Sequence, residues 1–174
     1  MIRLLSQRQE LVDDAYRMTT SWFTMFSDLV RRVNYSQWNP SATAYALTGT
    51  TDETTAATIN ALIGNTGSFR LTLGLSSTSS VNAKTVRVKL GSTTIQTFTL
   101  SNSTASQTAQ LVMTGRAASS QFSIPTSLIN CTSSGGIAST ENISVNIAIT
   151  VTLQLANSTE TVTLENYILE LEQV

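Results

Sequence analysis

Ile143-Ser144-Val145-Asn146-Ile147-Ala148-Ile149-Thr150-Val151-Thr152-Leu153-Gln154-Leu155 decides the fold of this chain. Seven apolar side chains stand at every second position, and polar or small ones fill the positions between them. Successive side chains of a β-strand point to opposite faces, whereas a helix repeats every 3.6 residues. The spacing therefore predicts one long strand over 142–155, with one face buried and the other wet.

The same period of two recurs in other segments, and about eight strands are expected in all. Gly91-Ser92 separates two of them at the distance of a hairpin. In the last strand the apolar positions change parity, and a bulge near Glu165-Asn166 would keep both sets facing inward. The segment 58–63 is left open between a helical turn and an extended edge segment. The predicted strands are 43–50, 69–76, 84–90, 93–100, 108–118, 120–124, 142–155 and 160–172.

These strands indicate a mainly β chain, an antiparallel β-sandwich and most simply a jelly roll, preceded by a short N-terminal α-helix. The helix is expected over 20–33, between an arm at 1–18 and a linker at 34–42. Trp22, Phe26, Leu29 and Val33 form one helical stripe. Pro40 disfavours helix in the residue before it, so the chain divides into an arm and helix, 1–38, and a β head, 39–174.

Composition excludes several kinds of function. The 174 residues carry a net charge of −1, which gives no strong field toward nucleic acid or an anionic membrane. With no His and a single Cys, Cys131, an intramolecular disulfide is impossible and a zinc site is not expected. We expect no cofactor and no metal. No segment is typical of a signal peptide or of a transmembrane span.

Catalysis is not expected either. Without His, a pair of carboxylates is the remaining option, and Asp52 and Glu53 are neighbours in sequence. Adjacent residues of a strand point to opposite faces, so they make a poor pair. Lys84, Arg87 and Lys89 are interpreted as keeping a strand face wet and discouraging edge pairing, in preference to contacting an anionic sugar.

The stretch around the predicted helix resembles the N-terminal virion-attachment segment of tailed-phage fibre and appendage proteins. The pattern runs from Asp13-Asp14 through Met18-Thr19 and Trp22-Phe23 to Arg31-Arg32. The resemblance implies that this segment anchors the chain in a virion, and its helix could also make a trimer contact. The alternative is that Trp22, Phe23 and Phe26 pack on the β domain of the same chain. The residues assigned to anchoring or trimer contact are Arg17, Met18, Thr19, Trp22, Phe23, Phe26, Leu29, Arg31, Arg32 and Val33.

A second resemblance covers most of residues 43–172. Segments such as Asn82–Ile95 and Glu160–Glu165 look like a β-sandwich domain of phage structural proteins, which is similar to the trimeric jelly rolls of the tumour necrosis factor type. This implies a homotrimeric virion protein made in the host cytoplasm, with a head that projects toward the host. Its partners would be other virion proteins, of the tail, neck or capsid, and a glycan or protein of the host surface.

Two alternatives stay open. A head fibre or decoration protein of the capsid would use the same anchor on shell subunits. A carbohydrate-binding module is the alternative of another class, although the head has few aromatic side chains for a sugar platform. After Pro40 these are Tyr45, Phe69, Phe98, Phe122 and Tyr167.

Overall fold

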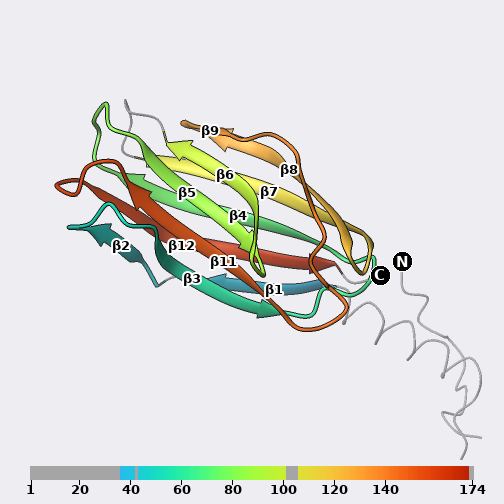
Figure 1. The fold of residues 1–174 in the computed structure, drawn as a ribbon. Helices are drawn as coiled ribbons and strands as arrows, with labels where there is room; N and C mark the ends of the chain where they lie inside the picture. The colour runs from blue at the N-terminus through green and yellow to red at the C-terminus, as the bar shows by residue number, and fades with distance from the viewer. Residues whose placement is uncertain (1–35, 42, 101–105, 173–174) are drawn as a thin grey trace, which may run out of the picture. The chain divides into compact units, whose positions relative to one another are not determined.

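In the computed structural model, two antiparallel sheets curl against each other (Figure 1). The structure describes residues 36–41, 43–100 and 106–172, with side chains from residue 41 on. Predictions for residues 1–35, including the helix at 20–33 and all ten assigned anchoring residues, lie outside this range and stay predictions. The strands are β1 (Ser36–Ser41), β2 (Tyr45–Thr48), β3 (Thr54–Ala61), β4 (Ser68–Ser77), β5 (Lys84–Leu90), β6 (Thr93–Leu100), β7 (Ser106–Ala117), β8 (Ser120–Ile129), β9 (Cys131–Ser133), β10 (Ile137–Ser139), β11 (Ile147–Leu155) and β12 (Thr161–Glu172).

The larger sheet has seven strands and the smaller has five. The larger is ordered β1-β12-β4-β7-β8-β10, and β2 also pairs with β12. The smaller is ordered β3-β11-β5-β6-β9. The described chain is thus a mainly β sandwich, as the period of two predicts.

The pairing between strands is nested. β5 pairs with β6, β4 with β7, β3 with β11, and β2 with β12. These four antiparallel pairs are those of one long hairpin whose two arms run through β2–β5 and β6–β12. The hairpin folds over, so that β12 also pairs with β4 in one sheet and β11 also pairs with β5 in the other. Strands distant in sequence therefore share both sheets.

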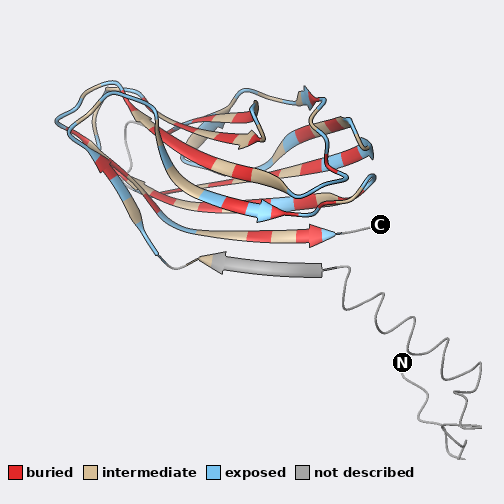
Figure 2. Cartoon of the chain, turned by 60° about the horizontal axis from the view of Figure 1, so that its bottom comes forward, coloured by how far each residue is buried: buried red, intermediate tan, exposed pale blue. Residues whose placement is uncertain are grey.

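One apolar face of each main strand forms the core. Buried and exposed residues alternate along the strands in Figure 2. On β5, positions 84, 86, 88 and 90 are buried while the positions between them are partly exposed. The largest apolar side chains with less than 2% exposure are Phe69, Phe98, Ile63, Leu71, Leu73, Leu90, Ile95, Leu111, Met113, Ile143 and Ile149.

Most predicted strands are confirmed, and the stretch 142–155 is wrong at its start. The strand begins at Ile147, and residues 143–145 form a turn. The Asn142 side-chain oxygen accepts hydrogen bonds from the amide and the hydroxyl of Ser144. This local turn overrides the alternation, and it leaves Val145 52% exposed while Ile143 stays in the core.

The predicted linker at 34–42 is also wrong over its described part. Residues 36–41 form β1, which pairs with β12 and has no partner on its other side in the larger sheet. Proline is tolerated in such an edge strand because one row of its amides needs no partner. Pro40 therefore lies opposite Ile168 within β1 and does not end the fold.

Further differences concern short or uncertain segments. The open segment 58–63 belongs mainly to β3, an edge strand of the smaller sheet. The segment 130–140, which no predicted strand covers, contains the short strands β9 and β10. The predicted bulge is confirmed: the register of β12 against β4 shifts between Leu164 and Asn166.

The sandwich has two different ends. Ser36 pairs with Glu172, so the chain enters and leaves the described fold at one end, which we call the base. The opposite end, the loop end, carries the connections 49–53, 78–83, 130 and 156–160 between described strands. Ser77 of β4 and Val162 of β12 pair close to that end.

The core predicts which truncations destabilise the fold. Leu73→Ala removes a fully buried side chain and leaves a cavity, so the free energy of unfolding should fall by about 2–5 kcal/mol. Val145→Ala, at a 52% exposed position, should change it by less than about 0.5 kcal/mol. Urea unfolding of both variants measures the difference. Equal effects would contradict the assignment of the core.

Candidate functional site at the loop end of the sandwich

Backbone hydrogen bonds join two connections at the loop end. The Ala156 amide donates to the Ala83 carbonyl at 2.9 Å, and the Thr78 amide donates to the Thr161 carbonyl at 2.9 Å. The Thr161 amide returns a bond to the Thr78 hydroxyl at 3.0 Å. The loop 78–83 is therefore held against the turn 156–160 at both of its ends.

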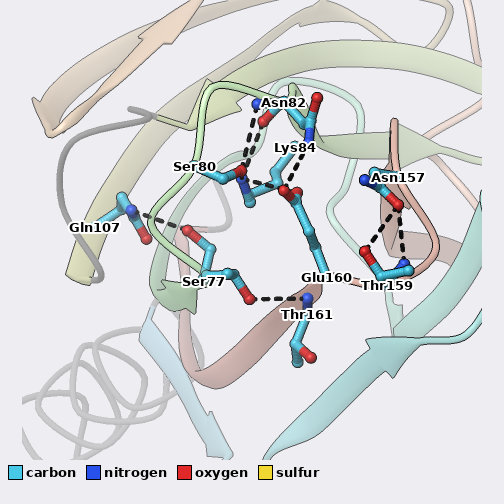
Figure 3. Close-up of polar contacts among 10 residues, drawn as sticks. Ser77, Ser80, Asn82, Lys84, Gln107, Asn157, Thr159, Glu160 and Thr161 are labelled. Atoms are coloured by element: carbon cyan, nitrogen blue, oxygen red, sulfur yellow. Dashed lines mark hydrogen bonds and ion pairs between the residues drawn. The ribbon is translucent and has the colours of Figure 1, made fainter.

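The turn 156–160 is itself stabilised locally. The Asn157 side-chain oxygen accepts from the amide and the hydroxyl of Thr159, both at 3.0 Å (Figure 3). The Glu160 amide closes the turn by donating to the Asn157 carbonyl at 3.2 Å. An asparagine side chain imitates a backbone turn in this way. Glu160, the last residue before β12, is thereby placed with its side chain against the neighbouring loop.

A buried ion pair links the same two connections. The Lys84 ammonium lies 3.1 Å from a Glu160 carboxylate oxygen, and the two side chains are 1% and 7% exposed. Lys84 also donates to the Ser80 hydroxyl at 2.7 Å and to the Asn82 carbonyl at 2.9 Å. The other carboxylate oxygen of Glu160 accepts from the Asn82 side chain at 2.8 Å (Figure 3). All partners of the pair thus come from the loop end.

Two sequence interpretations need correction here. Lys84 does not keep a strand face wet, because it has the same parity as Val86 and Val88 and is fully buried. Arg87 and Lys89 have the opposite parity and lie on the outer face of the smaller sheet, partly exposed. Their strand, β5, is flanked by β11 and β6, so it is not an edge that needs protection.

Glu53 forms ion pairs with both basic side chains of that outer face. It lies 3.1 Å from Arg87 and 2.6 Å from Lys89, and it accepts a bond from the Thr152 hydroxyl at 2.7 Å. The hydrogen bond with Lys89, followed by that with Thr152, lowers the pKa of the Glu53 carboxyl. These three partners favour the charged carboxylate, so Glu53 suits a structural role that joins the connection before β3 to β5 and β11.

A pocket of about 450 Å³ opens beside the joined loops. Asn130, between β8 and β9, adopts a left-handed backbone with φ of 57°, which asparagine tolerates better than most residues. Its side chain donates to the Ser106 carbonyl at 2.9 Å. The pocket is lined by Val81, Asn82, Ala83, Thr99, Leu100, Asn130, Cys131 and Thr132.

Cys131 is half-buried in the lining of this pocket. Its thiol donates to the Thr108 carbonyl, with a sulfur to oxygen distance of 3.4 Å. Burial raises the pKa of the Cys131 thiol, so the protonated form prevails at neutral pH. No charged base is brought beside it by the described lining residues, which favours an inert thiol over a nucleophile.

Three exposed apolar side chains lie along β8, and we call them the strip: Ile124 and Ile129 are on one face of the strand, and Leu128, opposite the buried Ala109 of β7, is on the other. Ile124, Leu128 and Ile129 are 43%, 38% and 55% exposed. Strand β10 pairs with β8 only at residues 121–123, so the outer edge of β8 beyond them has no partner among the described strands. The segment 120–129 has no charged side chain, and such an edge is suited to contact with another protein surface.

Sequence reasoning did not find the pocket or the ion pair. The sequence indicated the burial of Lys84 only through its position: it has the same parity as the apolar residues of β5, and these fix which face of the strand is buried. The pocket is built from three segments that are distant in sequence, 81–83, 99–100 and 130–132. No local pattern in Asn130-Cys131-Thr132 distinguishes that segment from an ordinary loop.

The described residues bring together no group of three or more His, Cys, Asp or Glu side chains that could hold a metal ion. Among the same residues, no helix has the length and apolar character needed to cross a membrane.

Comparisons with known proteins give no family. Neither the known protein families nor the curated proteins contain a match. Among solved structures, the chain is similar to lectin I of Ulex europaeus, crystallised with the methyl glycoside of α-L-fucose, at 10% identity and a TM-score of 0.39, covering 79% of this chain and 92% of that one. It is also similar to a chain of the infectious bursal disease virus Gx strain, at 11% identity and a TM-score of 0.26, covering 80% and 40%. Likeness this distant carries no argument about function.

The Glu160 carboxylate predicts that the stability of the fold decreases in acid. Hydrogen bonds from Ser80 and Asn82, with Lys84, lower the pKa of Glu160 below its ordinary value of 4.5. A carboxyl whose folded pKa is depressed contributes stability above the unfolded pKa and loses it as pH falls through the folded pKa. The free energy of unfolding should therefore be level near neutral pH and fall below about pH 4.5.

Glu160→Gln should flatten this fall, because it removes one of the protons taken up on acid unfolding. Glu165→Gln, on the exposed bulge of β12, is the matched control and should keep the slope. Urea unfolding at a series of pH values measures both variants. A Glu160→Gln profile parallel to that of the parent would contradict the assignment.

Proposed function

We propose that this chain is a non-catalytic structural protein of a tailed-phage virion, a short homotrimeric fibre or appendage of the tail or neck. Residues 1–38 attach it, and the β-sandwich head projects toward the host. The observation that carries the proposal is the placement of the two ends of the sandwich: the chain enters at the base, and the loops gather at the opposite end. A domain held at its base presents those loops outward.

The nested strand pairing supports the jelly-roll form of the head. The eight strands of the four nested pairs, β2 with β12, β3 with β11, β4 with β7 and β5 with β6, follow the winding of a jelly roll. Strands β1, β8, β9 and β10 are additions at its edges. Jelly rolls serve viral shells and binding domains alike, so the fold is compatible with the proposal and does not by itself select it.

The strip on β8 supports self-association of the head. A homotrimer closes by contacts between two different patches on neighbouring copies. The strip is apolar and uncharged, and a net charge of −1 opposes the approach of further copies only weakly. A second copy of this chain is therefore the occupant that we assign to it, with the contact made by side chains, since Pro125 interrupts the row of strand amides.

Attachment through the N-terminal arm is tested in the virion. A chain lacking residues 1–35 keeps all strands of the sandwich and should be absent from purified particles. Val81→Ser, which changes the loop end alone, should be incorporated at the parental level. Western blotting of particles measures both. Normal incorporation of the truncated chain would refute the anchoring role.

Cryo-EM of the particle places the protein at the tail, the neck or the capsid. Density on the capsid shell would replace the fibre proposal by a head fibre or decoration protein.

Trimerisation through β8 is tested in solution. The parental full chain should scatter light as three chains of 18.7 kDa each. Leu128→Lys together with Ile129→Lys places like charges on the strip and should lower the mass to that of one chain. Val145→Lys, at an exposed apolar position near the base, should remain trimeric. A trimer in the double variant would refute the assigned contact.

A further inference from the structure

The pocket at the loop end has the size of a small-molecule site. Its volume of about 450 Å³ lies within the range of roughly 300–1,000 Å³ that ligand pockets occupy. Its walls come from the β4–β5 loop at 81–83, the end of β6 at 99–100 and the β8–β9 turn at 130–132. Its strand residues belong to β6 and β9 of the smaller sheet, and the two connections that complete it leave β4 and β8 of the larger sheet.

Each wall is fixed without a ligand. The 81–83 wall is held by the Ala156 to Ala83 hydrogen bond and by the Lys84–Glu160 pair, to which Asn82 contributes two bonds. Strand pairing places Thr99 opposite Thr132 and Leu100 opposite Cys131. A site that is already ordered loses little conformational entropy when a ligand binds.

The lining selects an uncharged ligand. Among the described lining residues, Cys131 is the one ionisable side chain, and it stays protonated at neutral pH. The neighbouring Lys84 is covered and its charge is balanced by Glu160. A charged ligand would lose its hydration with no opposite charge to replace it.

The lining also has two kinds of contact to offer. Asn82, Thr99, Asn130 and Thr132 bring amide and hydroxyl groups that suit a ligand rich in hydroxyls. Val81, Ala83 and Leu100 are aliphatic, and Val81 is 86% exposed at the rim. No aromatic side chain is found in the described part of the lining, so a flat sugar face has no ring there to stack on, whereas a methyl group finds aliphatic partners.

We propose that this pocket binds a neutral saccharide that bears a methyl group, of the N-acetylhexosamine class. Hydroxyls of the sugar bond to the Asn and Thr side chains, and the acetamido methyl packs on the exposed Val81 and Ala83. That the sugar belongs to the host surface rests on the proposed function, because only a head held at its base turns this pocket outward. The binding itself does not depend on the virion.

The single cysteine reports on occupancy in the unmodified full chain. Alkylation of Cys131 by iodoacetamide at pH 8.5 should slow about tenfold when N-acetylglucosamine is present at ten times its Kd. Glucose, which lacks the methyl group, should protect less. N-acetylneuraminic acid, which carries a carboxylate, should not protect at all.

Val81→Asp places a charge at the rim of the pocket and should abolish protection, whereas Val145→Asp, near the base, should leave it unchanged. Both positions are exposed valines, so folding is spared in each. Saturation-transfer NMR on the same samples should show the acetamido methyl of the sugar as the most strongly contacted group. This second measurement does not depend on the reactivity of the thiol.

Absence of protection and of saturation transfer with every neutral N-acetylated sugar would overturn the proposal. So would equal protection by the charged sugar, or protection that survives Val81→Asp. Particle incorporation and solution mass are measured separately. A trimeric, incorporated protein without sugar binding would refute the pocket alone, and a sugar-binding protein absent from particles would refute the virion role alone.

Discussion

Every main strand must bury one face between the two sheets, and the rest of the structure follows from that constraint. The bulge in β12 exists because its apolar positions change parity after Leu164, and an extra residue restores them to the core. Ile143 remains buried in a turn for the same reason: its amide and carbonyl bond to Ala118 and Gly64, so the side chain reaches the core without belonging to a strand. A side chain can thus be buried in the core even where its backbone is not part of a strand.

The Lys84–Glu160 pair is the exception within this constraint, and its position explains why it is tolerated. A buried ion pair stabilises a fold poorly, since both charges lose their hydration, yet removing one partner is costly. Here the pair closes the loop end, where two connections that are distant in sequence must meet in one register. Ser80 and Asn82 complete its hydrogen bonds. A shift of Lys84 by one residue would carry its charge to the other face of the sheet, so the buried pair opposes a change of register of β5.

The sequence was most informative in strands where buried and exposed positions alternate regularly. It was least informative where segments that are distant in sequence come together. The β5 and β6 strands were predicted to the residue, because Gly91-Ser92 marks the turn and the apolar parity is unbroken. The start of β11 was overestimated, because alternation cannot reveal that Asn142 and Ser144 form a competing turn. β1 was missed because Pro40 argues against a strand unless the strand is known to lie at an edge. The pocket depends on Val81, Leu100 and Asn130 coming together, which is a property of the topology and of no single segment.

The two ends of the sandwich lie at opposite ends of the strands, and this separation connects the fold to the proposed role. Base and loop end are separated by strands of up to 12 residues. Side chains of the loops can therefore change without disturbing β1 or the pairing of Ser36 with Glu172. Loops carried by a rigid scaffold are where binding is usually found. In the proposed role, a protein that must keep its attachment while its target changes gains from having the two functions at opposite ends of one core.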